Sequence, residues 1–596
     1  MRMFFYFPMH YRILLTAALL LLTSFFKGIA AEAVLIEVDV SDRGRSINRW
    51  LYGINTAHWD ESLFPGPAEE MLLTADRQAI SLIRDSGVTL LKYPGGNAAD
   101  SYIWNSEANS PLEMDTDEYI ALCRATGAEP FITVNFNASP ELAADWVRYC
   151  NVQKDYNVEL WEIGDEQWGS WARGHGTSEA YAEKITAFAR AMKAVDPTIK
   201  VAMNVPLGPR ADNWTERVLA IAGEHVDLLT FTYFPLASEK ETDEELLASP
   251  ALYRIRKIEL RQKVEEMLGV DRASEILYVN LGYNSVSHSP GPQTLEVVNA
   301  LFVADLLGTM AETGTDIGCF WAIHNAYPPR GGDYGYLSSD GKNTPSYSYY
   351  VFPMFVNRFG DTMLKAKSSD PEVTVYASRD DEKVAVFLVN KNQGESKSVT
   401  VDLENFDPWS FAEVWILDEN RKNEQLPDIP LEKNFSIEVP PYSLVAINIR
   451  GADFQPEPVN LALRAEATAS SVSTIGPSFG PESAIDGLPH TRWDSAAWTK
   501  SDGKESQWIQ LEWEEPKLIS VVEIDWGRSF GIDYTLEASA DGSEWFTLAA
   551  VEDGSGGLER FEFDPIEVRF LRMNGTRGTP AISAYSIAEF KVFGPR

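Results

Sequence analysis

Cysteine and basic residues are scarce in this sequence, and each shortage excludes a class of protein. Its 596 residues include only Cys123, Cys150 and Cys319, so the chain is not a disulfide-stabilised scaffold. A bridge between Cys123 and Cys150 stays open, whereas Cys319 lies in an apolar run and is expected in the core. Acidic residues outnumber Lys and Arg by 88 to 51, and the net charge of −37 argues against nucleic acid or an anionic membrane as partner.

Long apolar runs are absent beyond the N-terminus. Arg2 and Arg12 precede the apolar run 13–26, and small residues follow it, which is the pattern of a cleaved signal peptide over residues 1–31. No later segment approaches the roughly 20 apolar residues that a membrane helix needs. We therefore expect a secreted or otherwise exported protein without a membrane span. Its acidic composition remains compatible with neutral ligands such as sugars.

The pattern of apolar runs divides the chain into several domains. Between about residues 50 and 360, short apolar runs alternate with amphipathic stretches, as in parallel strands connected by helices. The strands are expected near 50–55, 88–93, 130–135, 158–164, 199–204, 226–232, 276–282 and 316–322. Eight such units predict a (β/α)8 TIM barrel over residues 49–360.

Alternating strand patterns replace the helical pattern beyond Gly360. Residues 361–451 are expected to form a β-sandwich packed on the barrel, and the early strand-like segment 34–48 is expected to pair into it. Residues 452–459 read as a linker. Residues 460–596 form a further all-β unit rich in tryptophan.

An acidic pair follows the fourth expected strand. Because that strand ends at Gly164, Asp165 and Glu166 fall at its carboxyl end, where TIM barrels place catalytic groups. An isolated Asp-Glu pair at a strand end is more often a capped or solvated loop. Glu162 lies within the strand and is expected in a buried ion pair in the barrel.

Four barrel segments occur in a characteristic order. They are Tyr93-Pro94-Gly95-Gly96-Asn97 with Asp100, Tyr102 and Trp104; 133–136 with 144–147; Trp161 to Glu166; and Phe320-Trp321-Ala322-Ile323-His324-Asn325. Together they resemble α-L-arabinofuranosidases and their relatives in the (β/α)8 retaining glycoside hydrolase clan. The resemblance covers most of residues 34–450. It implies a polysaccharide or oligosaccharide substrate, Glu166 as general acid/base and no cofactor for catalysis.

Three positions depart from the pattern of these relatives. The seventh strand usually ends in Thr-Glu-Tyr-Asn-Ser, but here it reads Leu281-Gly282-Tyr283-Asn284-Ser285, so Gly282 stands where the nucleophilic Glu belongs. Asp165 replaces an Asn, and Thr232 replaces a His. Because attack and oxocarbenium stabilisation both depend on the missing carboxylate, ordinary retaining hydrolysis is not expected.

Alternatives to the missing nucleophile remain open. Asp165 could supply the second carboxylate, with water entering the space at Gly282 in an inverting reaction. A loop carboxylate such as Glu312 or Asp333 could also serve. Alternatively, the protein is a catalytically inactive carbohydrate-binding protein that uses the barrel cleft and the C-terminal unit.

Polar and aromatic residues at the same end of the barrel are candidates for sugar binding. They are Trp59, Asn97, Asn135, Tyr233, Tyr283, Trp321 and His324. Trp321 at its strand end is expected to form a stacking floor for a sugar, the alternative being core packing. Asn97 and Asn135 bind hydroxyls or stabilise turns, and each histidine taken alone could be incidental.

The C-terminal unit carries its own motifs, namely Asn460-Leu461-Ala462, 484–487 with 491–493, 508–511, 539–545, 569–572 and 586–590. They resemble a discoidin, or coagulation-factor type C, domain of the kind used as a carbohydrate-binding module. The resemblance implies a structural calcium ion held by Asp486 and Glu589, with Asp494 a weaker candidate. Candidate sugar contacts are His490, Trp498, Arg528, Phe530 and Arg577. The alternative is a domain that binds protein or only spaces the barrel.

Overall fold

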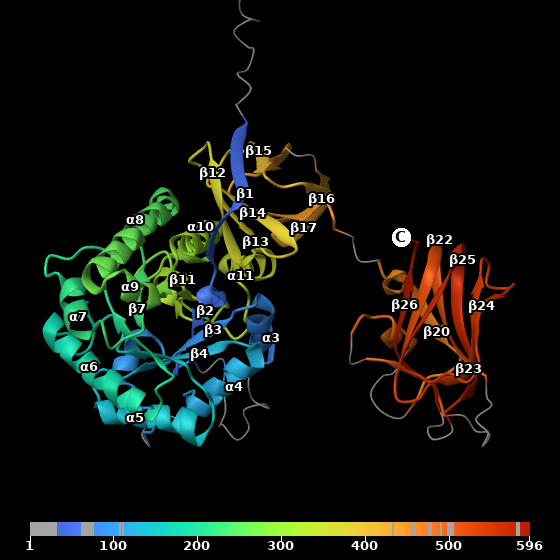
Figure 1. The fold of residues 1–596 in the computed structure, drawn as a ribbon, viewed down its shortest axis with the longest axis horizontal. Helices are drawn as coiled ribbons and strands as arrows, with labels where there is room; N and C mark the ends of the chain where they lie inside the picture. The colour runs from blue at the N-terminus through green and yellow to red at the C-terminus, as the bar shows by residue number, and fades with distance from the viewer. Residues whose placement is uncertain are drawn as a thin grey trace, which may run out of the picture. The chain divides into compact units, whose positions relative to one another are not determined.

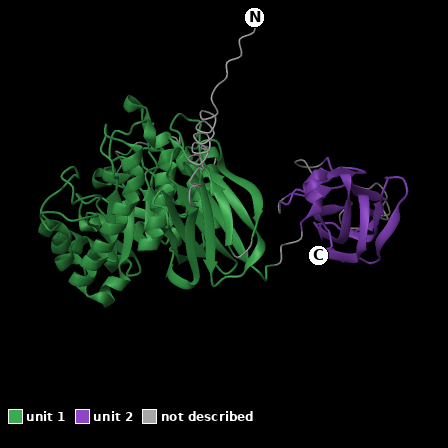
Figure 2. Ribbon diagram, turned by 90° about the horizontal axis from the view of Figure 1, so that it is seen from above, with its two compact units in different colours: residues 1–454 green, residues 455–596 purple. Residues whose placement is uncertain are grey.

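The computed structural model describes residues 33–60, 63, 77–106, 109, 113–431, 434–454, 459–474, 480–488, 491–497, 506–579 and 584–595. The expected signal peptide, 1–31, lies outside these residues. The chain divides into two compact units, Met1–Phe454 and Gln455–Arg596 (Figure 2).

The first unit is built around a closed barrel of eight strands, and each neighbouring pair is parallel (Figure 1). The strands are β2 (Gly53–Asn55), β3 (Leu90–Tyr93), β4 (Glu129–Val134), β5 (Leu160–Ile163), β6 (Lys200–Asn204), β7 (Leu228–Tyr233), β8 (Leu277–Tyr283) and β9 (Ile317–Phe320). Each falls at or within a residue or two of an apolar run named above. The predicted fold class is therefore confirmed.

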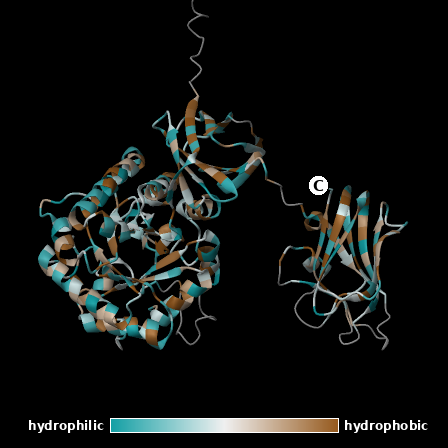
Figure 3. Cartoon of the chain, viewed as in Figure 1, coloured by the Kyte–Doolittle hydropathy of each residue, from teal (hydrophilic) through white to brown (hydrophobic). Residues whose placement is uncertain are grey.

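Helices surround the barrel and connect its strands (Figure 1). They are α3 (Arg77–Ser86), α4 (Thr116–Thr126), α5 (Pro140–Val147), α6 (Ser178–Val195), α7 (Trp214–Ala222), α8 (Asp243–Leu268), α9 (Val270–Glu275), α10 (Val297–Thr313) and α11 (Tyr347–Arg358). Their polar and apolar residues alternate along the ribbon (Figure 3). The Ser139 side chain caps α5 by accepting from the Leu142 N–H, and Pro140 occupies the first turn. A short hairpin of β10 (Ala326–Tyr327) and β11 (Gly332–Asp333) follows β9.

The barrel interior has an apolar layer below a polar one. The apolar layer contains Leu90, Phe131, Leu160, Ala202, Leu228, Val279, Leu281, Ile317 and Cys319. Two residues further along several strands, the inward positions carry Lys92, Thr133, Glu162, Asn204 and Thr230, all buried. Since side chains alternate along a strand, this polar layer lies toward the carboxyl end of the barrel.

Nine strands form one hydrogen-bonded sheet in the remainder of the first unit, in the order β17-β16-β19-β14-β13-β12-β1-β15-β18. They are β1 (Val34–Ser46), β12 (Thr362–Ser368), β13 (Val373–Arg379), β14 (Lys383–Asn390), β15 (Lys397–Glu404), β16 (Pro408–Leu417), β17 (Lys422–Pro430), β18 (Asn434–Val439) and β19 (Ser443–Gly451). The early strand β1 lies between β12 and β15. Because Ile36, Val401 and Ile447 share one apolar cluster, strands from both halves of the sheet pack on each other.

The C-terminal unit contains a seven-stranded antiparallel sheet with a separate apolar core. Its strands are β20 (Glu466–Ala469), β21 (Trp493–Asp494), β22 (Gln507–Trp526), β23 (Gly531–Ser539), β24 (Phe546–Val551), β25 (Leu558–Gly578) and β26 (Ser586–Phe593). Trp493 and Trp513 are fully buried in this core.

Cys123, Cys150 and Cys319 are all free and buried, so the bridge considered between the first two is not formed. Within the described residues, no helix has both the length and the apolar character needed to cross a membrane.

The sheet contacts the barrel through a close approach at Gly308 of α10. A Cβ atom at this position would lie 2.3 Å from the ring of Tyr376 on β13. The Tyr376 hydroxyl donates to Asp305 Oδ1 at 2.6 Å and lies 2.8 Å from Thr309 Oγ1, so the ring cannot move away freely. The absence of a side chain at Gly308 is therefore required for this contact.

We expect Gly308→Ala to lower the free energy of unfolding by about 1–3 kcal/mol, because the added methyl group overpacks this contact. Urea denaturation would measure the change. Gly394→Ala is the matched control, because its Cβ would meet only Asn392 Oδ1 at 3.9 Å. Equal stability of the two variants would contradict the packing argument.

Candidate functional site

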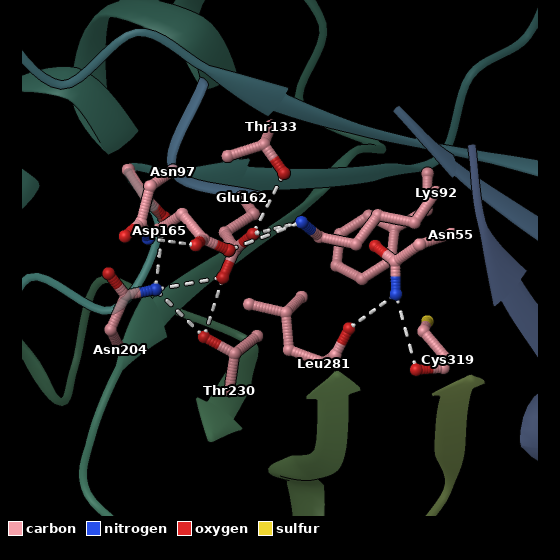
Figure 4. Close-up of polar contacts among 12 residues, drawn as sticks. Asn55, Lys92, Asn97, Thr133, Glu162, Asp165, Asn204, Thr230, Leu281 and Cys319 are labelled. Carbon is pink, nitrogen blue, oxygen red and sulfur yellow. Dashed lines mark hydrogen bonds and ion pairs between the residues drawn. The ribbon is translucent and has the colours of Figure 1, made fainter. Parts of the chain in front are cut away.

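A buried ammonium group organises the polar layer of the barrel. Lys92 Nζ lies 3.5 Å from Glu162 Oε2 and 3.4 Å from Asp165 Oδ1 (Figure 4). All three side chains are almost fully buried, and this ion pair confirms the role expected for Glu162. Burial lowers the pKa of Lys92, but the charges of Asp165 and Glu162 outweigh it and raise the pKa overall. The ammonium group therefore stays charged.

Hydrogen bonds from three other strands, β4, β6 and β7, fix the Glu162 carboxylate. Thr133 Oγ1 donates to Oε2, and Asn204 Nδ2 and Thr230 Oγ1 donate to Oε1, each at 2.8 Å (Figure 4). Burial raises the pKa of Glu162 to about 7, and Lys92 opposes the shift. These contacts engage both oxygens, so Glu162 is part of the frame below the site.

Asp165 is held from three directions. Asn97 Nδ2 donates to Asp165 Oδ2 at 2.5 Å, opposite the contact with Lys92 (Figure 4). The Asp165 backbone N–H donates to Asp100 Oδ2 at 3.3 Å, and Gln167 Nε2 donates to the same oxygen at 2.7 Å. Burial, and then the charge of Asp165, raise the pKa of Asp100 to about 8. Asp165 thus links the barrel interior to the loop that carries Glu166.

The Glu166 side chain is positioned by one residue of β7 and one of its own loop. Thr232 Oγ1 donates to Oε1 at 2.5 Å, and Trp171 Nε1 donates to Oε2 at 2.8 Å. The backbone of Glu166 has φ +49°, a conformation that non-glycine residues rarely adopt. Burial and the neighbouring Asp165 carboxylate raise the pKa of Glu166. A raised pKa favours the protonated form that a general acid requires.

A cavity of about 390 Å³ opens above these groups. Its lining includes six of the predicted site residues, namely Trp59, Asn97, Asp165, Glu166, Gly282 and Trp321. The other lining residues are Asn55, Gly95, Gly96, Ala98, Thr232, Phe234, Leu281, Ser287, His288, Asn325 and Tyr334. Asp165 and Glu166 are the only carboxylates among these described lining residues. A cavity of this size with aromatic walls suits a small ligand such as a sugar.

Gly96 allows Trp321 to lie against the floor of this cavity. A Cβ atom at Gly96 would lie 2.8 Å from the Trp321 ring, and its φ is +53°. Both the space and the backbone conformation therefore require glycine here.

The space at Gly282 would accept a side chain. A Cβ atom there would meet Phe234 and Thr232 Cγ2 at 3.6 Å, an ordinary van der Waals distance. Thr232 is also the residue that donates to Glu166, so position 282 and the acid lie on either side of one threonine. The register of β8 with β9 shifts between Asn280 and Tyr283. Asn55 Nδ2 donates to the Leu281 carbonyl at 3.0 Å in this irregular segment (Figure 4).

Four predicted binding residues lie outside the lining of this cavity. Asn135 accepts from the Asn137 N–H and donates to the Tyr102 carbonyl, which is the turn-stabilising arrangement. Tyr233 donates to the Ser249 carbonyl at 2.6 Å, and Tyr283 is buried against Phe320.

His324 lies between Asp60 and Asn343, at 2.9 Å from each, and is buried. Its two ring nitrogens are therefore already engaged.

The two loop carboxylates do not face Glu166. Glu312 lies at the end of α10, before the amino end of β9, and pairs with Arg254. Asp333 Oδ1 accepts from the Gly335 N–H at 2.7 Å, outside the cavity lining. Neither carboxylate therefore lines the cavity that contains Glu166 and Gly282.

Lys92 and Trp171 were not among the predicted site residues. Lys92 lies on β3, immediately before the Tyr93-Pro94-Gly95-Gly96 motif. Its position in the alternation of the strand faces the barrel interior, which could have indicated a partner for Glu162. Trp171 follows Glu166 by five residues, in a loop at the carboxyl end of the barrel. An aromatic residue in such a loop is itself a signal of ligand binding.

In the C-terminal unit, Asp486 and Glu589 lie near each other. The Gly487 N–H donates to Glu589 Oε1 at 2.8 Å, whereas the buried Oε2 has no hydrogen-bond partner among the described residues. Asp486 Oδ1 accepts from the Leu488 N–H and from Thr491 Oγ1. Burial raises the pKa of Glu589, and the charges of Asp486 and Asp525 add to the shift. An orphaned buried carboxylate oxygen beside a second carboxylate fits a hard cation.

The other candidates in this unit have separate places. Asp494 pairs with Arg492, and Arg577 pairs with Asp533 and Asp553. Phe530 packs on the core of the unit. His490 and Trp498 lie outside the described residues.

Comparison with known proteins agrees with this division of the chain. Residues 466–590 match the F5/8 type C domain family, so the C-terminal unit contains such a domain. The first unit has the fold of α-L-arabinofuranosidases. The crystal structure of the Thermotoga maritima enzyme in complex with arabinose matches 70% of this chain and all of that one, with a TM-score of 0.61 and 20% identity. Cel44A, an endoglucanase from Clostridium thermocellum, shares the fold with a TM-score of 0.53, 16% identity and the same coverage of 70% and 100%.

Arabinofuranosidases are also among the relatives by sequence. The intracellular exo-α-(1→5)-L-arabinofuranosidase of Halalkalibacterium halodurans is 25% identical over 458 residues, 65% of this chain and 90% of that protein. α-L-Arabinofuranosidase C of Emericella nidulans is 26% identical over 228 residues, 32% of this chain and 45% of the fungal protein. The resemblance predicted from the sequence motifs is therefore confirmed: the first unit is arabinofuranosidase-like.

We expect Lys92→Met to lower the free energy of unfolding by about 3–5 kcal/mol, because it leaves two buried carboxylates without their cation. Lys200→Met on β6 is the matched control. Lys200 pairs with Glu159, but both side chains are about one-third exposed, so its loss should cost less than about 1 kcal/mol. Chemical denaturation of both variants tests this, and an equal loss would contradict the assigned role of Lys92.

Proposed function

We propose that this protein binds an arabinose-containing glycan in the barrel cavity, and that Glu166 acts as the general acid of glycoside cleavage without a covalent intermediate. The observation that carries the proposal is the position of Glu166. Thr232 and Trp171 hold it at the cavity wall, and burial raises its pKa. Trp59 and Trp321 supply aromatic walls for a sugar ring. The arabinofuranosidase relatives support arabinose as the sugar.

In the proposed reaction, the Glu166 carboxyl group protonates the glycosidic oxygen as its bond to the anomeric carbon breaks. Water then attacks that carbon from the side of Gly282, where relatives carry the nucleophile. The proton that this water loses passes to solvent, and solvent returns a proton to Glu166. Asp165 is an unfavourable base for this water, because it is adjacent to Glu166 and engaged by Lys92 and Asn97. We therefore expect any turnover to be slow.

A second candidate is a carbohydrate-binding protein without catalysis. It is favoured by the described cavity lining, which offers no carboxylate apart from the adjacent Asp165 and Glu166. The F5/8 type C domain supports glycan binding under either proposal. The apolar N-terminal segment supports export, with the glycan met outside the cytoplasm.

Mutation of the acid and of Gly282 separates the two candidates. Wild-type hydrolysis of arabinan or arabinoxylan, whose sugar leaving groups must be protonated, should fall by about 100-fold or more in Glu166→Gln. Turnover that the wild type shows and Glu166→Gln loses supports the hydrolase. If the wild type shows no turnover, the result supports the carbohydrate-binding protein.

Gly282→Glu should raise hydrolysis of 4-nitrophenyl α-L-arabinofuranoside by at least about tenfold, because the site has space for the carboxylate that attacks in retaining relatives. Gly282→Gln fills the same space without the charge and should give no gain. Equal rates of the two variants would show that the rest of the cavity no longer supports the reaction.

We also propose that Asp486 and Glu589 hold a calcium ion in the C-terminal unit. No group of three or more acidic, His or Cys side chains suited to a metal occurs among the described residues, so backbone oxygens would complete the site. Calcium should stabilise this unit by about 2.7 kcal/mol at about 100 times its Kd.

Calorimetry of the full chain should show one thermal transition whose midpoint temperature falls on chelation with EDTA and recovers when calcium is added. The double variant Asp486→Asn, Glu589→Gln should lose this response. A wild-type transition unchanged by EDTA would refute the calcium site.

A further inference from the structure

A second cavity adjoins the first at Glu166. It has a volume of about 470 Å³. Its lining includes Trp168, Trp171, Gly208, Arg210 and Arg256, together with four residues that also line the first cavity. The shared residues are Glu166, Thr232, Phe234 and Ser287. Glu166 therefore stands at the boundary between two spaces.

The positions of Gly282 and Glu166 assign a direction to the cleft. Gly282, from whose side the anomeric carbon would be attacked, lines only the first cavity. The general acid protonates the oxygen that joins this sugar to the leaving group. The leaving group should therefore extend past Glu166 into the second cavity.

Two tryptophans give the second cavity a surface for sugar rings. Trp168 and Trp171 pack edge to face, with their ring centroids 5.1 Å apart. Trp171 is 57% exposed although its indole N–H is held by Glu166. An exposed ring in a fixed orientation suits stacking on a sugar.

One positive charge in this cavity lacks a partner among the residues that the structure describes. Arg210 is engaged through Nε and Nη2 by Asp212. Arg256, on α8, makes no hydrogen bond or ion pair with any described residue. It is half-buried, and its Nε and Cζ would lie 3.3 and 3.6 Å from a Cβ atom at Gly208.

The acidic residues around Arg256 do not neutralise it at close range. Glu216 and Glu259 line a third cavity together with Arg256, but neither forms an ion pair with it. Glu216 pairs with Lys263 at 3.5 Å. In a chain with a net charge of −37, an unpaired guanidinium at a cavity wall indicates an anionic ligand group.

We propose that the second cavity is a leaving-group subsite for a uronic acid residue, whose carboxylate is bound by Arg256. The planar guanidinium group can donate two parallel hydrogen bonds to a carboxylate. The proposal rests on the proposed function for the kind of glycan and for the direction of the cleft. It adds that the glycan carries a carboxylate next to the arabinose.

Binding measurements on the full chain in a Glu166→Gln background test this without requiring turnover. The probe is an arabinose-bearing oligosaccharide with one galacturonic acid, compared with its carboxyl-reduced form, in which that residue is galactose. The acidic form should bind about tenfold more tightly, as expected for one charge-assisted contact. Arg256→Gln should abolish the difference, whereas Arg210→Gln should preserve it, because Asp212 already engages Arg210.

Equal affinity for the two forms, or a preference that survives Arg256→Gln, would overturn the inference. A failure of the proposed hydrolysis gives a different result. The wild type would then show no turnover, but it would still bind the acidic form more tightly than the carboxyl-reduced form. Binding of the acidic form by the C-terminal unit would be independent of Arg256 and would count against the subsite.

Discussion

The buried ammonium group of Lys92 is the charge on which the candidate site depends. Glu162 and Asp165 would each be costly to bury as ions alone, and their shared contact with Lys92 offsets that cost. The same contact fixes the side chain of Asp165, and Asp100 accepts from its backbone N–H, immediately before Glu166 adopts its positive-φ conformation. The orientation of the acid at the cavity wall thus follows from an ion network inside the barrel.

This arrangement explains how position 282, the proposed counterpart of the nucleophile in relatives, can be glycine while the frame of the site stays intact. Gly282 lies in the irregular part of β8, where the Leu281 carbonyl is satisfied by Asn55. The network around Lys92 draws its contacts from β3, β4, β5, β6 and β7, and none from position 282. A carboxylate at 282 would add no contact to this network, so glycine at that position leaves the contacts around Lys92 intact.

The fold could be predicted from the sequence because buried parallel strands leave continuous apolar runs, and all eight barrel strands arise from such runs. The site could be predicted only in part. Asp165, Glu166 and Trp321 follow strand ends, which sequence position reveals. The partners of Tyr233 and His324 lie on separate segments, at Ser249, Asp60 and Asn343, and only the folded chain brings them together. Lys92 was missed for the same reason, since its partners lie 70 or more residues away.

Under the proposed function, Asp165 takes over part of the electrostatic role of the carboxylate that relatives carry at the position of Gly282. In a retaining pair, the negative charge of the nucleophile helps to keep the acid protonated by raising its pKa. Here burial raises the pKa of Glu166 first, and the Asp165 carboxylate contributes the next largest effect in the same direction. Because Lys92 and Asn97 fix Asp165 beside the acid, this charge does not depend on position 282. The departure at 165 therefore supports a protonated Glu166 in a cavity whose opposite wall carries no carboxylate among the described residues.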